Sequence, residues 1–228
     1  MGRDMSITTA QAAERLGVSA HEVRRLIATG ELSALPLGRL LLVEEESLLR
    51  RAQQVVRRGR PLASRTAWAA LFEISGERAE WLDRSSRSRL RFWLRRTDPE
   101  TIAAACRNRA DRRLLRVLPI YQQELLASSG VLHGGITADV GADILARSDD
   151  VQEIYCSSER LQTLESEYGL ISTSSPNLIV RVPTFEWSIV ARQQMPVGVV
   201  AVDLLESTDV RTRRAGRELL VTALSENM

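Results

Sequence analysis

The sequence predicts an α+β fold in three parts. Residues 1–56 hold two short helical segments and two strand-like runs around a turn. Residues 57–112 are expected to form an arginine-rich helical connector, and residues 113–228 alternate short apolar runs with helical segments. Such alternation is typical of a mixed sheet covered by helices, so the last part is expected to be a mixed α/β domain. With 228 residues, 44% of them hydrophobic, the chain can bury two modest cores.

Two capping boxes mark the first two helices. Thr8 and Gln11 stand three residues apart, as do Ser19 and Glu22, and side chains at this spacing satisfy backbone N–H groups where a helix begins. Gly17 lies between the two boxes, and glycine accepts the left-handed geometry in which helices commonly end. The sequence therefore predicts two helices separated by a very short turn.

The second of these helices, Ala20–Thr29, is amphipathic. Its apolar side chains face inward, whereas three polar side chains lie off that face: His21, Arg24 and Arg25. Two short helices joined by such a turn have the geometry in which the second helix enters a DNA major groove.

The residues that follow predict a wing. Leu32–Leu35 and Leu40–Val43 are strand-like, Pro36–Arg39 between them has turn chemistry, and helical spacing resumes over Glu44–Gln54. Arg39 would lie at the tip of this hairpin, where a cation can reach a phosphate or the minor groove. Residues 1–56 are thus expected to form a winged helix-turn-helix.

The same segment resembles a known family. The run TTAQAAERLGVS at Thr8–Ser19 fits the pattern S/T-x-x-x-A-A-x-x-L-G-V-S, the arginine-bearing helix ends in T-G-E-L, and G-R stands in the wing. These motifs are similar to the excisionase-type branch of the MerR-like winged helices. The resemblance implies DNA binding; the alternative is an interaction domain that uses the fold without touching DNA.

Seven residues form the candidate DNA-contacting set: Ser19, His21, Arg24, Arg25, Arg39, Arg58 and Arg60. Arg24 and Arg25 are the candidates for base edges, because guanidinium groups read guanine in a bidentate way. Ser19 and Arg39 are expected to hold phosphates, and for His21 either contact or plain solvation is open. The tetrapeptide RGRP, Arg58–Pro61, looks like the core of an AT-hook, which enters an A·T minor groove, although a basic linker is the favoured interpretation.

Charge is divided unevenly along the chain. Residues 1–118 hold 23 Arg and 14 acidic residues, a net charge of +9, while residues 119–228 hold 8 Arg and 15 acidic residues, −7. A basic N-terminal half is typical of a polyanion binder, whereas the acidic half could face a basic protein or solvent.

In the connector, the arginines of Arg84–Arg96 form either a second cationic surface or internal ion pairs. The acids considered for those pairs are Glu77, Glu80, Asp83 and Asp111.

The last part of the chain supplies strands and helices in alternation. Its apolar runs, expected to be strands, are Leu114–Leu118, Val131–His133, Glu153–Cys156, Leu178–Val182 and Val197–Asp203. Its helical segments are Ile120–Ala127, Ala138–Ala146, Ser158–Tyr168 and Val210–Leu224. The run that begins at Val197 is continuous rather than alternating, which predicts a central strand buried on both faces.

No pattern for catalysis or for a metal is complete. His133-Gly134-Gly135 before Asp139 and Asp143 resembles a nucleotidyltransferase turn, but the acids stand four apart in a helical segment instead of two apart on a strand. The chain has no lysine for a phosphate-cradling loop and no Gly-x-Ser-x-Gly elbow. Two distant cysteines, Cys106 and Cys156, are expected to be buried thiols. We therefore expect no enzyme activity, no catalytic residue, no metal and no cofactor.

The closing segment, VGVVAVDLLESTDVRTRRAGRELL at Val197–Leu220, resembles the C-terminal end of AbiEi-type antitoxin regulators of type IV toxin–antitoxin systems. Further matches are GRPLASRTAW at Gly59–Trp68 and GADILA at Gly141–Ala146. The resemblance implies that the N-terminal domain represses an antitoxin–toxin operon. It also implies that the C-terminal domain opposes a nucleotidyltransferase-like toxin.

The sequence as a whole predicts a DNA-binding transcriptional regulator. We expect it to bind double-stranded DNA at an inverted repeat in its own promoter as a homodimer, because one short recognition helix reads too few base pairs. A cytoplasmic location is expected, since no apolar run approaches the roughly 20 residues of a membrane span and the N-terminus lacks a signal peptide. The alternatives are an excisionase-like architectural factor and a ligand-sensing transcription factor.

Overall fold

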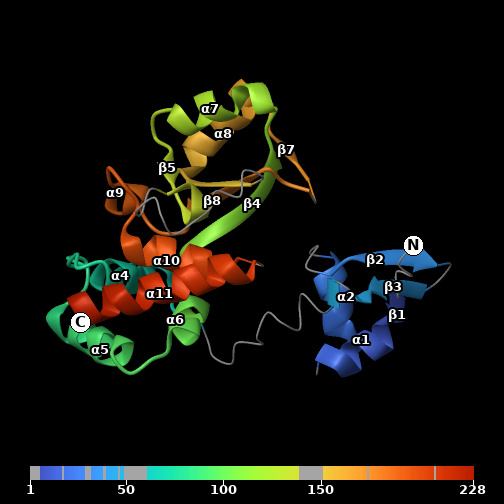
Figure 1. The fold of residues 1–228 in the computed structure, drawn as a ribbon, viewed down its shortest axis with the longest axis horizontal. Coiled ribbons are helices and arrows are strands. Elements are labelled where there is room, and N and C mark those ends of the chain that lie inside the picture. The colour runs from blue at the N-terminus through green and yellow to red at the C-terminus, as the bar shows by residue number, and fades with distance from the viewer. Residues whose placement is uncertain are drawn as a thin grey trace. The chain divides into compact units, whose positions relative to one another are not determined.

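The computed structural model describes residues 6–16, 18–28, 32–37, 40–45, 47–48, 61–138, 151–173, 175–207 and 209–228. The chain divides into two compact units, Met1–Arg58 and Gly59–Met228 (Figure 1). The described residues confirm the predicted α+β fold, because each unit combines helices with a sheet of its own.

In the first unit, the two predicted helices are α1, Thr9–Leu16, and α2, Ala20–Ala28. The first capping box is confirmed, since the Thr8 N–H donates to Gln11 Oε1 at 3.0 Å and the Gln11 N–H donates to Thr8 Oγ1 at 3.3 Å. At the second box, the Glu22 N–H donates to Ser19 Oγ at 3.1 Å. The helices and the sheet share one small core, made of Ala12, Ala13, Val23, Leu26, Leu32, Val43 and Leu48.

The wing is confirmed as an antiparallel hairpin of β2, Ala34–Leu37, and β3, Leu40–Glu44. Its first strand begins two residues later than predicted, and Pro36 and Leu37 belong to it rather than to a turn, with Leu37 facing Leu40 in the register. A third strand, β1, Ser6–Thr8, was not predicted; it pairs with β3 and gives the order β1-β3-β2. Three residues are too few to show an alternating pattern.

The second unit begins with α4, Ser64–Ile74, α5, Arg84–Leu94, and α6, Pro99–Ala105. A short turn of 3-10 helix, η1, Cys106–Arg109, leads into strand β4, Ala110–Arg116. The helical connector predicted to reach residue 112 therefore ends earlier, since Ala110 already pairs with Pro183 of the sheet.

The rest of the second unit confirms a mixed sheet. After β4 come α7, Pro119–Ala127, β5, Leu132–His133, and the 3-10 turn η2, Gly135–Thr137. They are followed by β6, Gln152–Tyr155, α8, Ser158–Tyr168, β7, Ile171–Ser172, and β8, Leu178–Pro183. The strand order is β5-β6-β8-β4-β7, with β6 and β8 parallel and the other pairs antiparallel.

The chain closes with three helices, α9, Trp187–Val190, α10, Val197–Leu205, and α11, Val210–Asn227. The prediction of a buried strand over Val197–Asp203 is wrong, because this run is helix α10. A continuous apolar run fits a helix buried on all sides as well as it fits a central strand. Two glycines allow the close packing: a Cβ at Gly198 would lie 2.6 Å from Leu71 O of α4, and one at Gly216 would lie 2.8 Å from Ala201 O of α10.

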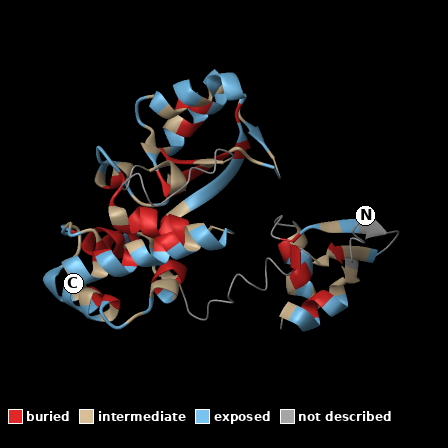
Figure 2. Ribbon diagram, viewed as in Figure 1, coloured by how far each residue is buried: buried red, intermediate tan, exposed pale blue. Residues whose placement is uncertain are grey.

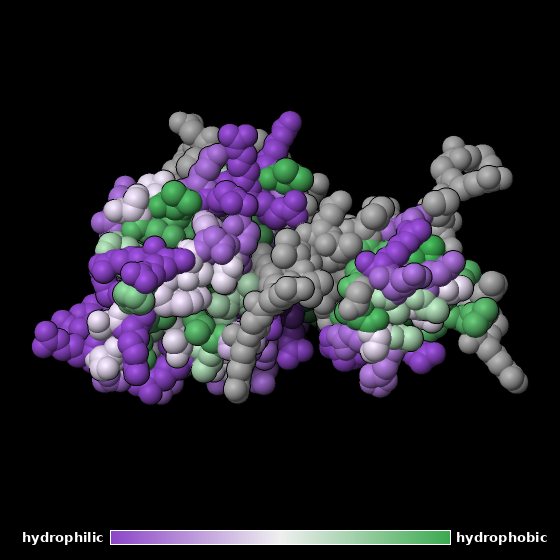
Figure 3. All heavy atoms as spheres, turned by 90° about the horizontal axis from the view of Figure 1, so that it is seen from below, coloured by the Kyte–Doolittle hydropathy of each residue, from purple (hydrophilic) through white to green (hydrophobic). Residues whose placement is uncertain are grey.

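Two hydrophobic cores fill the second unit. The larger lies among α4, α5, α6, α10 and α11, and α10 is buried almost throughout, as Figure 2 shows in red. The smaller lies between the sheet and the two helices α7 and α8. On the face of the molecule drawn in Figure 3, hydrophilic side chains surround small apolar patches.

Candidate nucleic-acid interface

Helix α2 presents a polar stripe to solvent. His21, Arg24 and Arg25 are all exposed, whereas Val23 and Leu26 on the opposite side are buried. Residues three and four apart lie on the same side of a helix, so the three polar side chains share one face. This is the face that a recognition helix would turn toward DNA.

The two arginines of this stripe differ in their surroundings. Arg25 is held by Glu22 of the same helix, with Nε 2.9 Å from Oε2 and Nη2 2.7 Å from Oε1. Arg24, in contrast, has no carboxylate within 4 Å among the residues that the structure describes. Arg24 can therefore reach a ligand without giving up an ion pair, whereas Arg25 must first leave Glu22.

Ser19 lies one residue before α2, where its hydroxyl oxygen already accepts the Glu22 N–H. The hydroxyl hydrogen can still be donated, so Ser19 can cap the helix and hold a phosphate oxygen at the same time. Three predicted contacts, Arg39, Arg58 and Arg60, lie outside the described residues, as does Gly17 of the predicted turn.

The wing carries a feature that the sequence analysis missed. Leu35 on β2 and Leu40 on β3 are 56% and 60% exposed, although both belong to apolar runs. Only their position in a two-stranded ribbon, with one face turned away from the small core, separates them from the buried leucines. Apolar side chains on such a ribbon can contact sugars or thymine methyl groups.

The comparison with known proteins agrees with this geometry. A family model described as a helix-turn-helix domain matches residues 6–55. No curated protein and no solved structure matches the chain. Among the described residues, no helix is both long and apolar enough to cross a membrane.

In the second unit, most of the six arginines in Arg84–Arg96 are held by the protein itself. Arg87 and Arg91 approach the buried carboxylate of Glu73 at 3.9 and 2.8 Å. Arg91 and Arg95 also donate to backbone carbonyls of residues 227 and 228, and the Arg96 guanidinium lies 4.0 Å from the ring centroid of Phe92. Glu73 is thus the main carboxylate partner, and it was not among the acids considered from the sequence.

A buried ionic cluster joins the sheet to α10. Asp203 accepts hydrogen bonds from Arg109 Nη2 at 2.5 Å, from Tyr155 Oη at 2.7 Å and from the Gly135 N–H at 3.1 Å. One turn later, Glu206 accepts a hydrogen bond from Arg109 Nη1 at 2.8 Å and pairs with Arg181 Nη2 at 2.9 Å. Arg181 also donates to the buried Glu153.

The arginines of this cluster oppose the effect of burial on the pKa values of its glutamates. Burial alone would raise the pKa of Glu206, but Arg109 and Arg181 lower it to about 2. Burial raises the pKa of Glu153, and Arg181 opposes that shift. No buried polar side-chain atom among the described residues lacks a hydrogen-bond partner. Each of the three carboxylates of this cluster, Glu153, Asp203 and Glu206, is therefore held by an arginine.

The Gly134-Gly135 turn covers this cluster. A Cβ at Gly135 would lie 2.0 Å from Glu153 Oε2, and one at Gly134 would lie 2.7 Å from the Tyr155 ring, so both positions exclude a side chain. The motif weighed as a nucleotidyltransferase turn therefore packs on buried ion pairs, while Asp139 and Asp143 lie outside the described residues. Within the described ranges, no three His, Cys, Asp or Glu side chains are placed to hold a metal ion.

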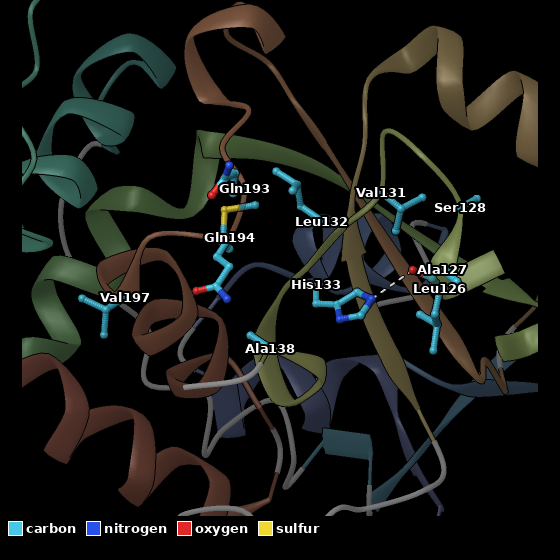
Figure 4. Close-up of a pocket in the computed structure, with 11 residues that line it drawn as sticks. Leu126, Ala127, Ser128, Val131, Leu132, His133, Ala138, Gln193, Gln194 and Val197 are labelled. Atoms are coloured by element: carbon cyan, nitrogen blue, oxygen red, sulfur yellow. Dashed lines mark hydrogen bonds between the residues drawn. The ribbon is translucent and has the colours of Figure 1, made fainter. Parts of the chain in front are cut away.

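The second unit also contains a cavity and two buried thiols. A cavity of about 540 Å³ lies beside α7, β5 and the loop before α10, and His133 Nε2 on its wall lies 3.0 Å from the Leu126 carbonyl (Figure 4). A carbonyl oxygen can only accept, so Nε2 is the donor in this contact. Cys106 and Cys156 are buried as expected, and burial raises both thiol pKa values to about 12. Such thiols are unreactive.

Proposed function

We propose that this protein is a sequence-specific DNA-binding transcriptional regulator. The observation that carries the proposal is the outer stripe of α2, in which the exposed Arg24 has no carboxylate partner among the described residues, within a domain that matches the helix-turn-helix model. Arg24 reads base edges, Ser19 at the start of the helix holds a phosphate, and His21 lies between them on the same face. A role at DNA also fits a cytoplasmic location.

A finer role goes with this proposal. We infer a homodimer that represses its own operon at an inverted repeat, because α2 has nine residues and spans only about 13 Å of a groove. An antitoxin role against a nucleotidyltransferase-like toxin rests only on the resemblance in sequence, chiefly that of Val197–Leu220. In the fold, Asp203 and Glu206 of that segment lie in the ionic cluster, so they act in folding rather than in contact with a toxin.

The second unit is proposed to have no enzyme activity. The acidic groups that could serve as catalytic acids or bases, Glu153, Asp203 and Glu206, are each paired with an arginine. A general acid or base must be able to reach a substrate proton, and these carboxylates are engaged in the protein interior.

The test is a mobility shift with the full chain on DNA from its own upstream region and on scrambled DNA of equal length. Selective binding by the wild type that is lost in Arg24→Ala supports the regulator. Glu218→Gln, on the surface of the second unit, is the control and should bind as the wild type does. Equal binding of the wild type to both DNAs would reject sequence-specific regulation and favour an architectural factor.

The finer roles have separate tests. Light scattering of the free protein and of its complex with a palindromic duplex measures whether one or two copies are present. The antitoxin role requires a nucleotidyltransferase-like toxin gene beside this one, and purified toxin must be inhibited by the full chain. A monomer on DNA, or a toxin that keeps its activity, would reject the corresponding role without affecting DNA binding.

A further inference from the structure

The chain from Arg107 to Arg116 exposes an unusual number of cations. It holds five arginines and one acid, Asp111, and four of the five arginines are exposed: Arg107, Arg112, Arg113 and Arg116. The fifth, Arg109, is buried in the ionic cluster. This segment comprises the turn η1 and strand β4, which Figure 2 draws in pale blue along much of its length.

One edge of β4 is largely open. The strand pairs with β8 through Ala110–Leu115 on one side, but on the other side β7 pairs with Leu115 and Arg116 alone. No described strand pairs with that edge over residues 110–113. Successive side chains of a strand point to opposite faces, so Arg113, on the open part of the edge, and Arg116, where β7 pairs, lie on opposite faces of the sheet.

Five other arginines of the second unit differ from the exposed arginines of this segment. Arg78, Arg160, Arg192, Arg214 and Arg217 each have a carboxylate partner: Glu80, Glu167, Glu77, Glu218 and Glu100. Among the described residues, no carboxylate lies within 4 Å of Arg107, Arg113 or Arg116. Arg116 donates to a neutral acceptor, the Ser175 carbonyl, at 3.0 Å.

Arg112 belongs with the ionic cluster instead. It faces Arg181 in the register of β4 and β8, and directly opposed residues share a face of the sheet. The cluster holds three carboxylates, Glu153, Asp203 and Glu206, against the two arginines Arg109 and Arg181. Arg112 supplies a third positive charge on that side, which leaves Arg107, Arg113 and Arg116 as uncompensated cations.

Cations without a carboxylate partner repel one another, so we ask which role these arginines could serve. Charged side chains on an edge strand can serve simply to prevent pairing with another sheet. A DNA-binding chain has a second use for them, since half to two-thirds of protein–DNA hydrogen bonds go to phosphate and sugar. The short helix α2 offers few such contacts, so phosphate contacts elsewhere in the molecule would add affinity.

We propose that Arg107, Arg113 and Arg116 form a second, sequence-independent phosphate-binding surface along β4 of the second unit, with Arg113 and Arg116 contributing from opposite faces of the sheet. The proposal rests on the proposed function, because it takes the polyanion to be the DNA that the helix-turn-helix domain selects. The helix-turn-helix domain then determines which sequence is bound, and the β4 surface adds affinity for any duplex that is already held.

The test compares two triple variants of the full chain. Arg107→Gln/Arg113→Gln/Arg116→Gln removes the proposed surface, whereas Arg78→Gln/Arg214→Gln/Arg217→Gln removes the same charge from arginines that are already paired. The affinity of each for the upstream duplex and for a scrambled duplex is measured across salt. The slope of log Kobs against log salt falls by about 0.9 for each lost phosphate contact, or about 2.7 for three.

The expected result is a decrease of about 2.7 in that slope for the first variant on both duplexes, with little change for the control. Equal changes in the two variants, or none in either, would overturn the proposal. Unchanged slopes with reversible dimers or aggregates of the first variant would assign these arginines to edge protection. The comparison is valid if both triple variants melt at the same temperature as the wild type. If the first triple variant melts at a lower temperature, the single variants Arg113→Gln and Arg116→Gln are measured in its place.

Arg24→Ala separates this proposal from the proposed function. It should abolish the preference for the upstream duplex and leave the binding of scrambled DNA nearly unchanged. If Arg24→Ala has no effect while the β4 variant loses its slope, the assigned recognition helix is wrong and the phosphate surface stands. If Arg24→Ala removes selectivity while the β4 variant behaves as the wild type does, the phosphate surface is wrong.

Discussion

Replacing Asp203 by asparagine should strongly destabilise the second unit. The Asp203 side chain is completely buried and accepts from Arg109, Tyr155 and the Gly135 N–H, while Arg181 Nε lies 3.3 Å away. Asparagine keeps the shape but removes the negative charge and turns one acceptor into a donor that faces other donors. Breaking a buried ion pair from one side costs about 3–5 kcal/mol, because the remaining charge is left uncompensated.

For a domain of 150–250 residues, each kcal/mol shifts the melting temperature by about 2–4 °C, so Asp203→Asn should lower it by about 6–20 °C. Calorimetry of the full chain can assign the shift to one unit, since the first unit keeps its own transition. The exposed pair Arg214–Glu218, 2.8 Å long, provides the control, and Glu218→Gln should cost only a few tenths of a kcal/mol. A loss below about 1 kcal/mol in Asp203→Asn would refute the reasoning.

Three further predictions follow from the same structure. Arg24→Ala should weaken binding to the upstream duplex by about 1–3 kcal/mol in a titration, and Arg25→Ala by less, because Arg25 is already paired with Glu22; equal losses would contradict the distinction. Gly198→Ala should lower the free energy of unfolding, measured in urea, by about 1–3 kcal/mol, because the new Cβ would meet Leu71 O. In the control Gly169→Ala, the new Cβ meets nothing within 4 Å, so only the strain of the positive φ should appear. The Glu206 pKa lies at about 2 in the fold against 4.5 in the unfolded chain, so its stabilising effect is full above about pH 5 and is lost as the pH falls toward 2; Glu206→Gln should flatten that part of the stability–pH curve, and an unchanged curve would disprove the assignment.

Local rules predicted the first unit well. Thr8, Gln11 and Ser19 act within one helical turn, so their roles can be read from spacing alone. The same holds for α8, whose bounds Ser158 and Tyr168 match the prediction. Strand β1 was missed because its stability comes from pairing with β3, more than thirty residues away in the chain.

The errors in the second unit have one physical origin. Whether Val197–Asp203 is a strand or a helix depends on what packs around it, and that information lies in α4 and α11. The ionic cluster was also invisible, because Arg109, Arg181 and Asp203 come from three distant parts of the chain. Among many arginines and acids on a charged chain, no local pattern marks the few that are buried together.

The pair of Glu22 and Arg25 has a consequence for how the proposed regulator would search DNA. Glu22 acts as an internal competitor, since each phosphate or base that attracts Arg25 must displace a carboxylate that already makes two hydrogen bonds. A loosely placed phosphate offers little more than this carboxylate does, whereas a guanine in the correct position offers a bidentate contact of its own. Arg25 would therefore remain on Glu22 while the protein slides over unrelated sequence and would transfer to DNA at the operator. In the proposed regulator, a single acidic residue would thus reduce the time spent on wrong sites without weakening the final complex to the same extent.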